Sequence, residues 1–175
     1  MAIDEIKDVS LVVGLGNPGK EYERTYHNAG RLALAALAPE TGWHARDKFR
    51  YVKETGRTFA APETFMNESG EAVAAALKYF KVKPVDLLVI HDDCDLPLGQ
   101  WKLQFGRGSA GHRGIASIIA HLKTDEFWRL RIGIRDAAEK KRRKAGDFVL
   151  NRIGAEAMKD LDRVIDDIKK ELLQA

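Results

Sequence analysis

The sequence lacks the features that would place it in a membrane or outside the cell. Its 175 residues include one cysteine, Cys94, which rules out an internal disulfide and fits a reducing compartment. No apolar run approaches the roughly 20 residues that a spanning helix needs. The N-terminus carries acids at Asp4 and Glu5 and lacks the long apolar segment of a secretory signal. These absences predict a cytoplasmic protein without a membrane partner.

The chain also has little net charge, since 29 Lys and Arg residues face 26 Asp and Glu residues for a formal charge of +3. One unbroken cationic run stands out at residues 140–144, Lys-Lys-Arg-Arg-Lys. Such a run indicates either a contact with a polyanion or a solvated loop, and both readings stay open. No repeat or linker divides the chain, and the 45% hydrophobic content suffices for one core. We therefore predict a single domain over residues 1–175.

Segments with the periodicity of strands alternate with segments of helical periodicity along the whole chain. The predicted strands cover residues 9–13, a hairpin within 47–61, then 86–90, 100–105 and 128–134. The predicted helices cover residues 32–38, 69–80, 112–122 and 155–173. The strand at 86–90 is expected to end in a polar loop, 91–95. This alternation predicts an α/β domain with a central mixed sheet flanked by helices.

Polar residues gather where the predicted elements end. His27 is the side chain in the glycine-rich segment 14–30 that can exchange a proton near neutral pH. Asp92 follows an apolar strand and could orient that imidazole, while amides from Asn17 and Asn67 could hold a carbonyl group or a water molecule. No serine or cysteine stands beside the histidine, so this set favours hydrolysis by an activated water. A histidine bonded only for structural reasons is the competing interpretation.

Two other uses of these segments are weakly supported. The acidic run from His91 to Asp95 lacks the spacing and the closing Glu of a calcium loop, and the chain has no His-x-x-x-His or Cys-x-x-Cys pair. The glycines from Gly14 to Gly19 have the wrong spacing for a dinucleotide fingerprint, and Pro18 would interrupt the helix start that binds the pyrophosphate. The residues alone therefore give little support to a metal site or to a dinucleotide site.

Five motifs, in order, resemble bacterial-type peptidyl-tRNA hydrolase. They are Gly-Leu-Gly-Asn-Pro-Gly-x-x-Tyr-x-x-Thr-x-His-Asn-x-Gly, Pro-x-Thr-Phe-Met-Asn-x-Ser-Gly, His-Asp-Asp-x-Asp-Leu-Pro-x-Gly, Gly-His-x-Gly and Arg-Leu-Arg-Ile-Gly-Ile. The resemblance covers residues from about 9 to 150. It implies a monomeric α/β enzyme without a cofactor. It also implies cleavage of the ester between a peptide and the 3′ end of tRNA, which frees the tRNA for reuse.

The resemblance also implies roles for individual residues. His27 matches the general base, Asp92 the carboxylate that holds it, and Asn17 the amide linked to recognition of the N-blocked substrate. The positions that match the lining of the cleft around the peptide and the terminal adenosine are Tyr22, Phe65 and Asn67, and Met66 of the same motif is a further predicted binding residue. Lys102 and Arg131 match basic positions that bind tRNA phosphate, and Arg129 is expected on the same strand face. Such contacts suit an enzyme that accepts nearly every tRNA.

The chain departs from the family pattern at several positions. Arg113 stands where the family has a substrate-contacting asparagine, so the site keeps donors there but loses an acceptor and gains a charge. It is expected either to contact a tRNA phosphate or to weaken substrate positioning. Gln104 stands where a second phosphate-binding lysine is common, and Arg107 and Arg135 stand where glycine is common. Positive charge is therefore redistributed around the predicted cleft.

These departures leave two alternatives to the esterase. The first is an RNA-binding protein without turnover on the same scaffold, because the fold has a relative that serves in plastid RNA splicing. The extra arginines would suit that role. The second is a small-molecule hydrolase that no longer depends on tRNA. The retention of His27, Asp92, Asn17 and Asn67 favours the esterase.

Overall fold

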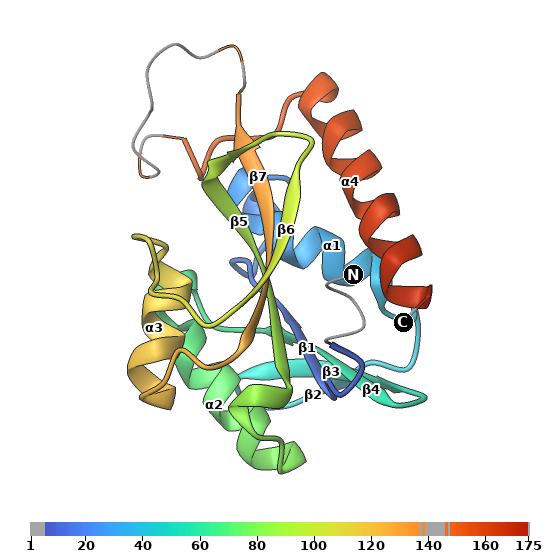
Figure 1. Cartoon of the computed structure of the whole chain (residues 1–175), viewed down its shortest axis with the longest axis vertical. Coiled ribbons are helices and arrows are strands. Elements are labelled where there is room, and N and C mark those ends of the chain that lie inside the picture. Colours follow the sequence, from blue (N-terminus) through green and yellow to red (C-terminus); the bar gives the residue numbers. More distant parts are fainter. Residues whose placement is uncertain (1–5, 137, 139–145, 147, 175) are drawn as a thin grey trace.

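A computed structural model describes residues 6–136, 138, 146 and 148–174, so the cationic run 140–144 lies outside the described residues. One seven-stranded sheet has the order β2-β3-β4-β1-β5-β7-β6 (Figure 1). Its strands are β1 (Leu11–Gly14), β2 (His44–Ala45), β3 (Phe49–Glu54), β4 (Arg57–Pro62), β5 (Leu87–Pro97), β6 (Trp101–Phe105) and β7 (Trp128–Arg135). The α-helices are α1 (Ala29–Leu37), α2 (Ser69–Phe80), α3 (Arg113–Leu122) and α4 (Ala155–Gln174). Short 3-10 helices are η2 (Lys20–Tyr22), η3 (Tyr26–Asn28), η4 (Met66–Glu68) and η5 (Pro84–Asp86).

The sheet is mixed, as the sequence predicts. Strands β4, β1, β5 and β7 run parallel to one another, whereas β2, β3 and β6 join antiparallel at the two ends. The carboxyl ends of parallel strands lie at one end of a sheet, where α/β folds place their polar loops. The segments after β1 and β4 carry two of the predicted polar clusters, and the third, His91 with Asp92, lies on β5.

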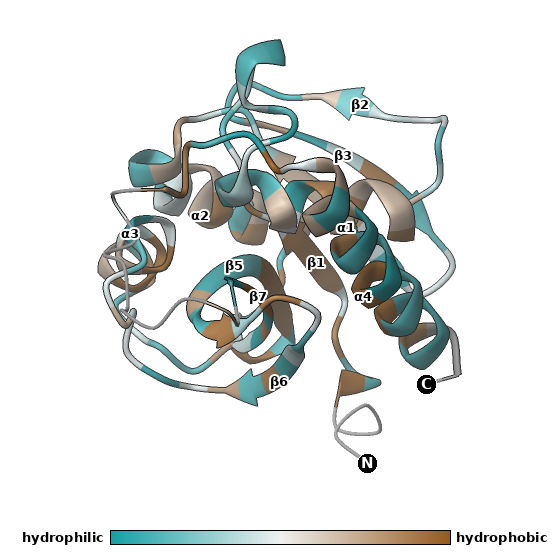
Figure 2. Cartoon of the chain, turned by 90° about the horizontal axis from the view of Figure 1, so that it is seen from above, coloured by the Kyte–Doolittle hydropathy of each residue, from teal (hydrophilic) through white to brown (hydrophobic). Residues whose placement is uncertain are grey.

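Two apolar cores cover the two faces of the sheet. One core joins α1 and α4 to the strands through residues such as Leu34, Ile90 and Ile165. The other joins α2 and α3 through residues such as Val73, Val89 and Ile118. Figure 2 shows α1 and α4 on one side of the strands and α2 and α3 on the other. Among the described residues, no helix combines the length and the apolar character that crossing a membrane requires.

The predicted loop at residues 91–95 is wrong, because β5 continues through it to Pro97. The ladder to β7 extends past the apolar run, pairing His91 with Arg131 and Asp92 with Ile132, and then shifts its register before Pro97. A Cβ on Gly133 of β7 would lie 1.9 Å from the Pro97 carbonyl oxygen, so glycine is required where the backbones of the two paired strands come this close. The acidic residues are therefore held on a strand and not on a loop.

The start of α1 also differs from the prediction, since the helix begins at Ala29 and not at residue 32. Gly30 lets this first turn approach β5, because a Cβ there would lie 2.2 Å from the Ile90 carbonyl oxygen. This close packing brings the segment that precedes α1, including His27, against the strand that carries Asp92. A further difference is the short edge strand β2, which the sequence pattern did not predict.

Candidate active site

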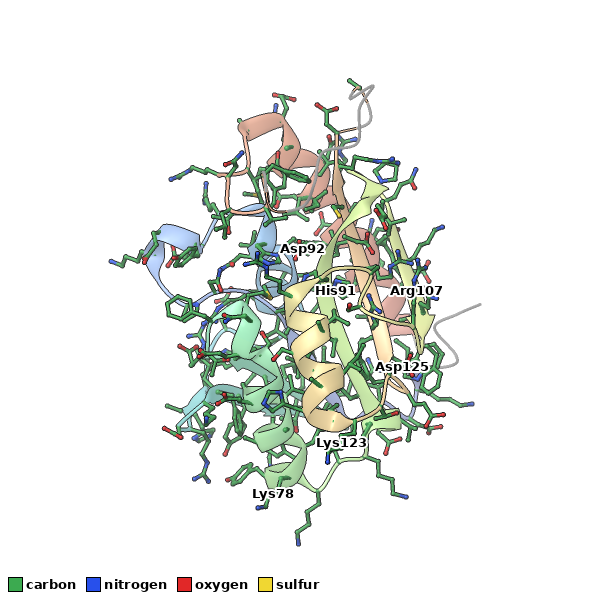
Figure 3. All side chains as sticks on the ribbon, turned by 90° about the vertical axis from the view of Figure 1, so that its left-hand side faces the viewer. Lys78, His91, Asp92, Arg107, Lys123 and Asp125 are labelled. Atoms are coloured by element: carbon green, nitrogen blue, oxygen red, sulfur yellow. The ribbon has the colours of Figure 1, made fainter. Side chains whose placement is uncertain are left out.

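A cavity of about 670 Å³ opens at the carboxyl ends of β1 and β4 and beside β5. Residues from three of the predicted polar segments and from the start of α3 line this cavity. The predicted site residues that line it are Asn17, His27, Phe65, Met66, Asn67, Asp92 and Arg113. In Figure 3, His91 and Asp92 lie near the beginning of α3. The fold thus gathers residues that are far apart in the sequence at one place.

His27 and Asp92 are in direct contact. The Nδ1 atom of His27 lies 2.9 Å and 3.0 Å from the two carboxylate oxygens of Asp92, which is 2% exposed. A carboxylate accepts the Nδ1 proton, so the Nε2 atom of the neutral ring carries the lone pair. The His27 backbone N–H donates to the Val149 carbonyl, which fixes the segment behind the ring. This pairing gives His27 the orientation and the tautomer of a general base.

His112 is a second partner of Asp92 that the sequence reasoning did not assign. Its Nε2 atom lies 2.9 Å from Asp92 Oδ1, and its ring centre lies 4.9 Å from that of His27. His112 is also the N-cap of α3, where Nδ1 accepts from the Ile115 N–H at 3.2 Å. Because Nδ1 accepts, the ring proton sits on Nε2 and is donated to Asp92. The signal in the sequence was a histidine at the first position of the predicted helix 112–122, within the motif Gly-His-x-Gly.

The two histidines keep Asp92 ionised. Burial by itself would raise the pKa of this carboxyl group, but the nearby His112 and His27 and their hydrogen bonds outweigh it and lower the pKa. The carboxylate therefore stays negative over the whole neutral range. A fixed negative charge beside His27 stabilises the imidazolium that forms when the ring takes a proton.

Asn17 is held with its amide oxygen turned inward. Its Oδ1 atom accepts from the Met66 N–H at 2.7 Å, while its backbone N–H donates to Asn28 Oδ1 at 2.9 Å. Asn28 Nδ2 in turn donates to the Asn17 carbonyl at 3.0 Å. The group of Asn17 left to meet a substrate in the cavity is therefore its Nδ2 donor. Asn28, which clamps this loop, is a further residue that the sequence reasoning did not single out.

The chain is similar to known proteins over nearly its whole length. Residues 11–175 match the family model described as peptidyl-tRNA hydrolase. The chain belongs to the peptidyl-tRNA hydrolase family. It is 42% identical to the peptidyl-tRNA hydrolase of Marinobacter nauticus over 97% of this chain and 89% of the relative. It is 44% identical to that of Lactobacillus delbrueckii subsp. bulgaricus, over 91% of this chain and 92% of the relative. The solved peptidyl-tRNA hydrolase of Acinetobacter baumannii superposes with a TM-score of 0.80 at 33% identity, covering 96% of this chain and 90% of that chain.

Membership of the peptidyl-tRNA hydrolase family leaves open whether the cluster of His27, Asp92 and His112 could hold a metal ion, since their ligand atoms lie within 4.8 Å of one another. The tautomers argue against it. A metal on His112 Nε2 would move the ring proton to Nδ1, where the Ile115 N–H already donates. The hydrogen-bond pattern therefore fits a proton-transfer site better than a metal site.

A buried pair, Arg129 and His91, lies next to Asp92 in the peptidyl-tRNA hydrolase site. Arg129 is 1% exposed, and its Nε–H donates to His91 Nε2 at 3.2 Å, so His91 carries its proton on Nδ1 and donates it to the Asp92 carbonyl at 2.6 Å. Burial lowers the pKa of His91 well below 6.5, and the neighbouring His112 and Arg129 act in the same direction. Burial also lowers the pKa of Arg129, to about 10, so that it remains charged near neutral pH.

The depressed pKa of His91 predicts a dependence of stability on pH. Below pH 6.5 the unfolded chain takes up a proton at this histidine while the folded chain does not. The free energy of unfolding therefore falls as pH falls, by up to about 1.4 kcal/mol per pH unit. We expect His91→Gln to flatten this slope between pH 6.5 and 5 in urea denaturation. The control is His44→Gln, at an exposed histidine, which should keep the wild-type slope. A wild-type slope in His91→Gln would contradict the conclusion that His91 causes this pH dependence.

Tyr22 does not line the cavity, contrary to the expectation that it shapes the cleft directly. It packs edge-on against Phe65, with ring centres 6.2 Å apart. Phe65 is 51% exposed on one rim of the cavity, and Leu150, which is 56% exposed, lies on another part of its lining. The opening thus carries apolar side chains that are unusually exposed. They suit the contact with an apolar part of a ligand.

The two predicted phosphate contacts differ in accessibility. Lys102 and Arg131 are paired across β6 and β7, so they share a face, and Arg129 lies on the same face as expected. Lys102 is exposed. Arg131, however, is buried, with Nε 2.6 Å from Asp93 Oδ2 and Nη1 donating to Gln104 Oε1 at 2.8 Å. The prediction of a phosphate contact at Arg131 does not fit this internal pairing.

Proposed function

We propose that this chain hydrolyses the ester that joins the carboxyl group of a peptide to the 3′ end of tRNA, releasing both. The observation that carries the proposal is the hydrogen-bonded pair of His27 and Asp92 within the cavity. Membership of the peptidyl-tRNA hydrolase family supports the choice of substrate. A protein that only binds RNA does not require a buried histidine that a carboxylate orients as a general base.

The proposed reaction begins with a water molecule beside His27. Nε2 takes one proton from the water as its oxygen attacks the ester carbonyl carbon, and Asp92 stabilises the imidazolium that forms. The tetrahedral intermediate then collapses. The bond between the carbonyl carbon and the ribose 3′ oxygen breaks, and the imidazolium returns its proton to that oxygen. The products are a peptide carboxylic acid, which ionises, and tRNA with a free 3′ hydroxyl group.

Asn17 explains why the substrate should carry a blocked amino group. Its Oδ1 is occupied by the Met66 N–H, so Nδ2 faces the ligand as a donor. A peptide carbonyl accepts from that donor, whereas the ammonium group of an unblocked aminoacyl-tRNA offers only protons. We propose that Asn67, which is exposed in the cavity lining, positions the ester, and that Phe65 and Met66 contact the peptide and the terminal adenosine. Tyr22 acts through Phe65.

On the tRNA side, we propose phosphate contacts at Lys102, which is exposed on β6, and at Arg113, which lines the cavity. Arg131 supports the site through its pair with Asp93. The proposed chemistry uses no metal and no cofactor. A monomeric state and a cytoplasmic location stay predictions.

The test is release of tRNA from N-acetylaminoacyl-tRNA compared with the same aminoacyl-tRNA left unblocked. We expect cleavage of the blocked ester to be favoured by about 100-fold or more, because a mismatched polar contact in a closed site discriminates strongly. Binding of either tRNA without release would contradict the enzyme and favour an RNA-binding protein. Equal cleavage of both esters would contradict the role of Asn17.

A further inference from the structure

Two exposed arginines flank the loop that enters α3. Arg107 lies just after β6, and Arg113 is the first residue of α3. Figure 3 shows Arg107 on the side of β6 and β7. Both side chains are exposed, and the described residues include no ion-pair partner for either one. The residues between them, from Ser109 onward, line the cavity.

The loop between these arginines is anchored from below. The Nη1 atom of the buried Arg129 donates to the carbonyl oxygens of Arg107 and Gly108, at 3.0 Å and 2.9 Å. A guanidinium group holds two acceptors in a fixed geometry, so the backbone at this point is well constrained. The exposed guanidinium groups are therefore presented from a fixed loop, which lowers the entropy lost when they bind a ligand.

Two arginines of β7, Arg131 and Arg129, are already used within the protein. Arg131 is ion-paired with Asp93, and Gln104, its second partner, carries no charge. Arg129 lies buried under the loop. Of Lys102, Arg129 and Arg131, which share this face of β6 and β7, Lys102 is therefore the one exposed to solvent.

Acidic residues outnumber lysine and arginine in the described lining of the cavity. Its lining includes Asp92, Asp93 and Asp95, whereas Arg113 is the one Lys or Arg side chain among the described lining residues. A tRNA end that enters this cavity brings further negative charge with each phosphodiester group. Cations at the entrance are needed to offset that repulsion, and Arg113 has the position and the free charge to do so.

We propose that Arg107 and Arg113 form a phosphate-binding rim of the cleft, where they contact phosphodiester groups of the tRNA acceptor end. Arg113 lies nearest the ester, and Arg107 contacts a phosphate farther from the 3′ end. This inference rests on the proposed function for the identity of the ligand. It assigns a task to two of the three arginines by which this chain departs from the family pattern, and it moves the phosphate contact from Arg131 to the loop.

The test is equilibrium binding of deacylated tRNA to the full chain over a series of KCl concentrations. We expect Arg107→Gln and Arg113→Gln each to make the plot of log affinity against log salt less steep by about one, and the double variant by about two. Arg113→Lys keeps the charge and should retain the wild-type slope. The matched control is Arg163→Gln, which removes an exposed arginine from α4.

A second arm identifies which part of the substrate the arginines contact. We expect both loop variants to lower kcat/KM for N-acetylaminoacyl-tRNA much more than for an N-acetylaminoacyl ester of adenosine, which has no phosphate. Equal losses on the two esters, or wild-type salt slopes in both loop variants, would overturn the proposal. Because the binding slopes do not depend on turnover, they decide this inference even if the wild type cleaves neither ester.

Discussion

Replacing His27 with alanine should reduce the rate of ester cleavage by about 10² to 10⁴-fold, while the affinity for tRNA stays near that of the wild type. The rate falls because no other described group in the cavity offers a lone pair held in place by Asp92. The affinity stays because His27 is buried, at 8% exposure, and contributes little surface for contact. Single-turnover cleavage of N-acetylaminoacyl-tRNA, with tRNA affinity measured separately, checks both expectations.

The matched control for this change is His44→Ala, which removes an exposed histidine on β2, at the far edge of the sheet. It should cleave the substrate at the wild-type rate. Cleavage by His27→Ala within a few fold of the wild type would show that another group activates the water. A parallel loss of tRNA affinity would show that His27 supports binding and not chemistry.

Asp92→Asn should cause a loss of similar size, with most of it in kcat. Oδ1 of the carboxylate accepts from both His27 and His112, and Oδ2 lies 3.0 Å from the same Nδ1 atom of His27. An asparagine places an NH2 donor at one of these two oxygen positions, where it opposes the proton on His27 Nδ1. One ring must then turn or change its tautomer. If His27 shifts its proton to Nε2, the base is lost, and no negative charge remains to stabilise the imidazolium.

Asp92→Asn both removes the negative charge beside His27 and disturbs the hydrogen bonds of the two histidines, and a comparison with His112→Gln separates these effects. The glutamine variant keeps the carboxylate and the pair with His27, so it should retain much more activity than Asp92→Asn. Asp162→Asn, an exposed change on α4, controls for the loss of one negative charge. If Asp92→Asn cleaves the substrate at a rate near that of the wild type, the orientation of His27 does not depend on this carboxylate.

The main elements of the fold could be predicted from the sequence, because each apolar segment has a clear period. The mixed sheet and the helices α1 to α4 follow from those patterns, as does the proximity of polar residues at strand ends. The continuation of β5 through Asp92 could not be predicted in the same way. Its polar residues read as a loop, and only their pairing with β7 makes them a strand.

The candidate site was predictable where one residue type suits one task. The pair of His27 and Asp92 follows from their chemistry and from the order of the motifs, and the two side chains do touch. The contacts that depend on tertiary packing could not be predicted from the sequence. They are the hydrogen bond of His112 to Asp92 and the hydrogen bonds between Asn28 and Asn17. Nor could the sequence indicate that Arg131 is buried against Asp93, since an alternating strand pattern does not distinguish a solvated cation from a paired one.

The most direct test of the central claim is a single turnover of N-acetylaminoacyl-tRNA by the wild-type chain in water enriched in ¹⁸O. If a water activated by His27 attacks the ester carbonyl carbon, mass spectrometry will find one ¹⁸O atom in the carboxyl group of the released N-acetylamino acid. The tRNA will keep an unlabelled 3′ hydroxyl group. Label in the tRNA end, or tRNA that binds and is not released from its acyl group, would contradict the account.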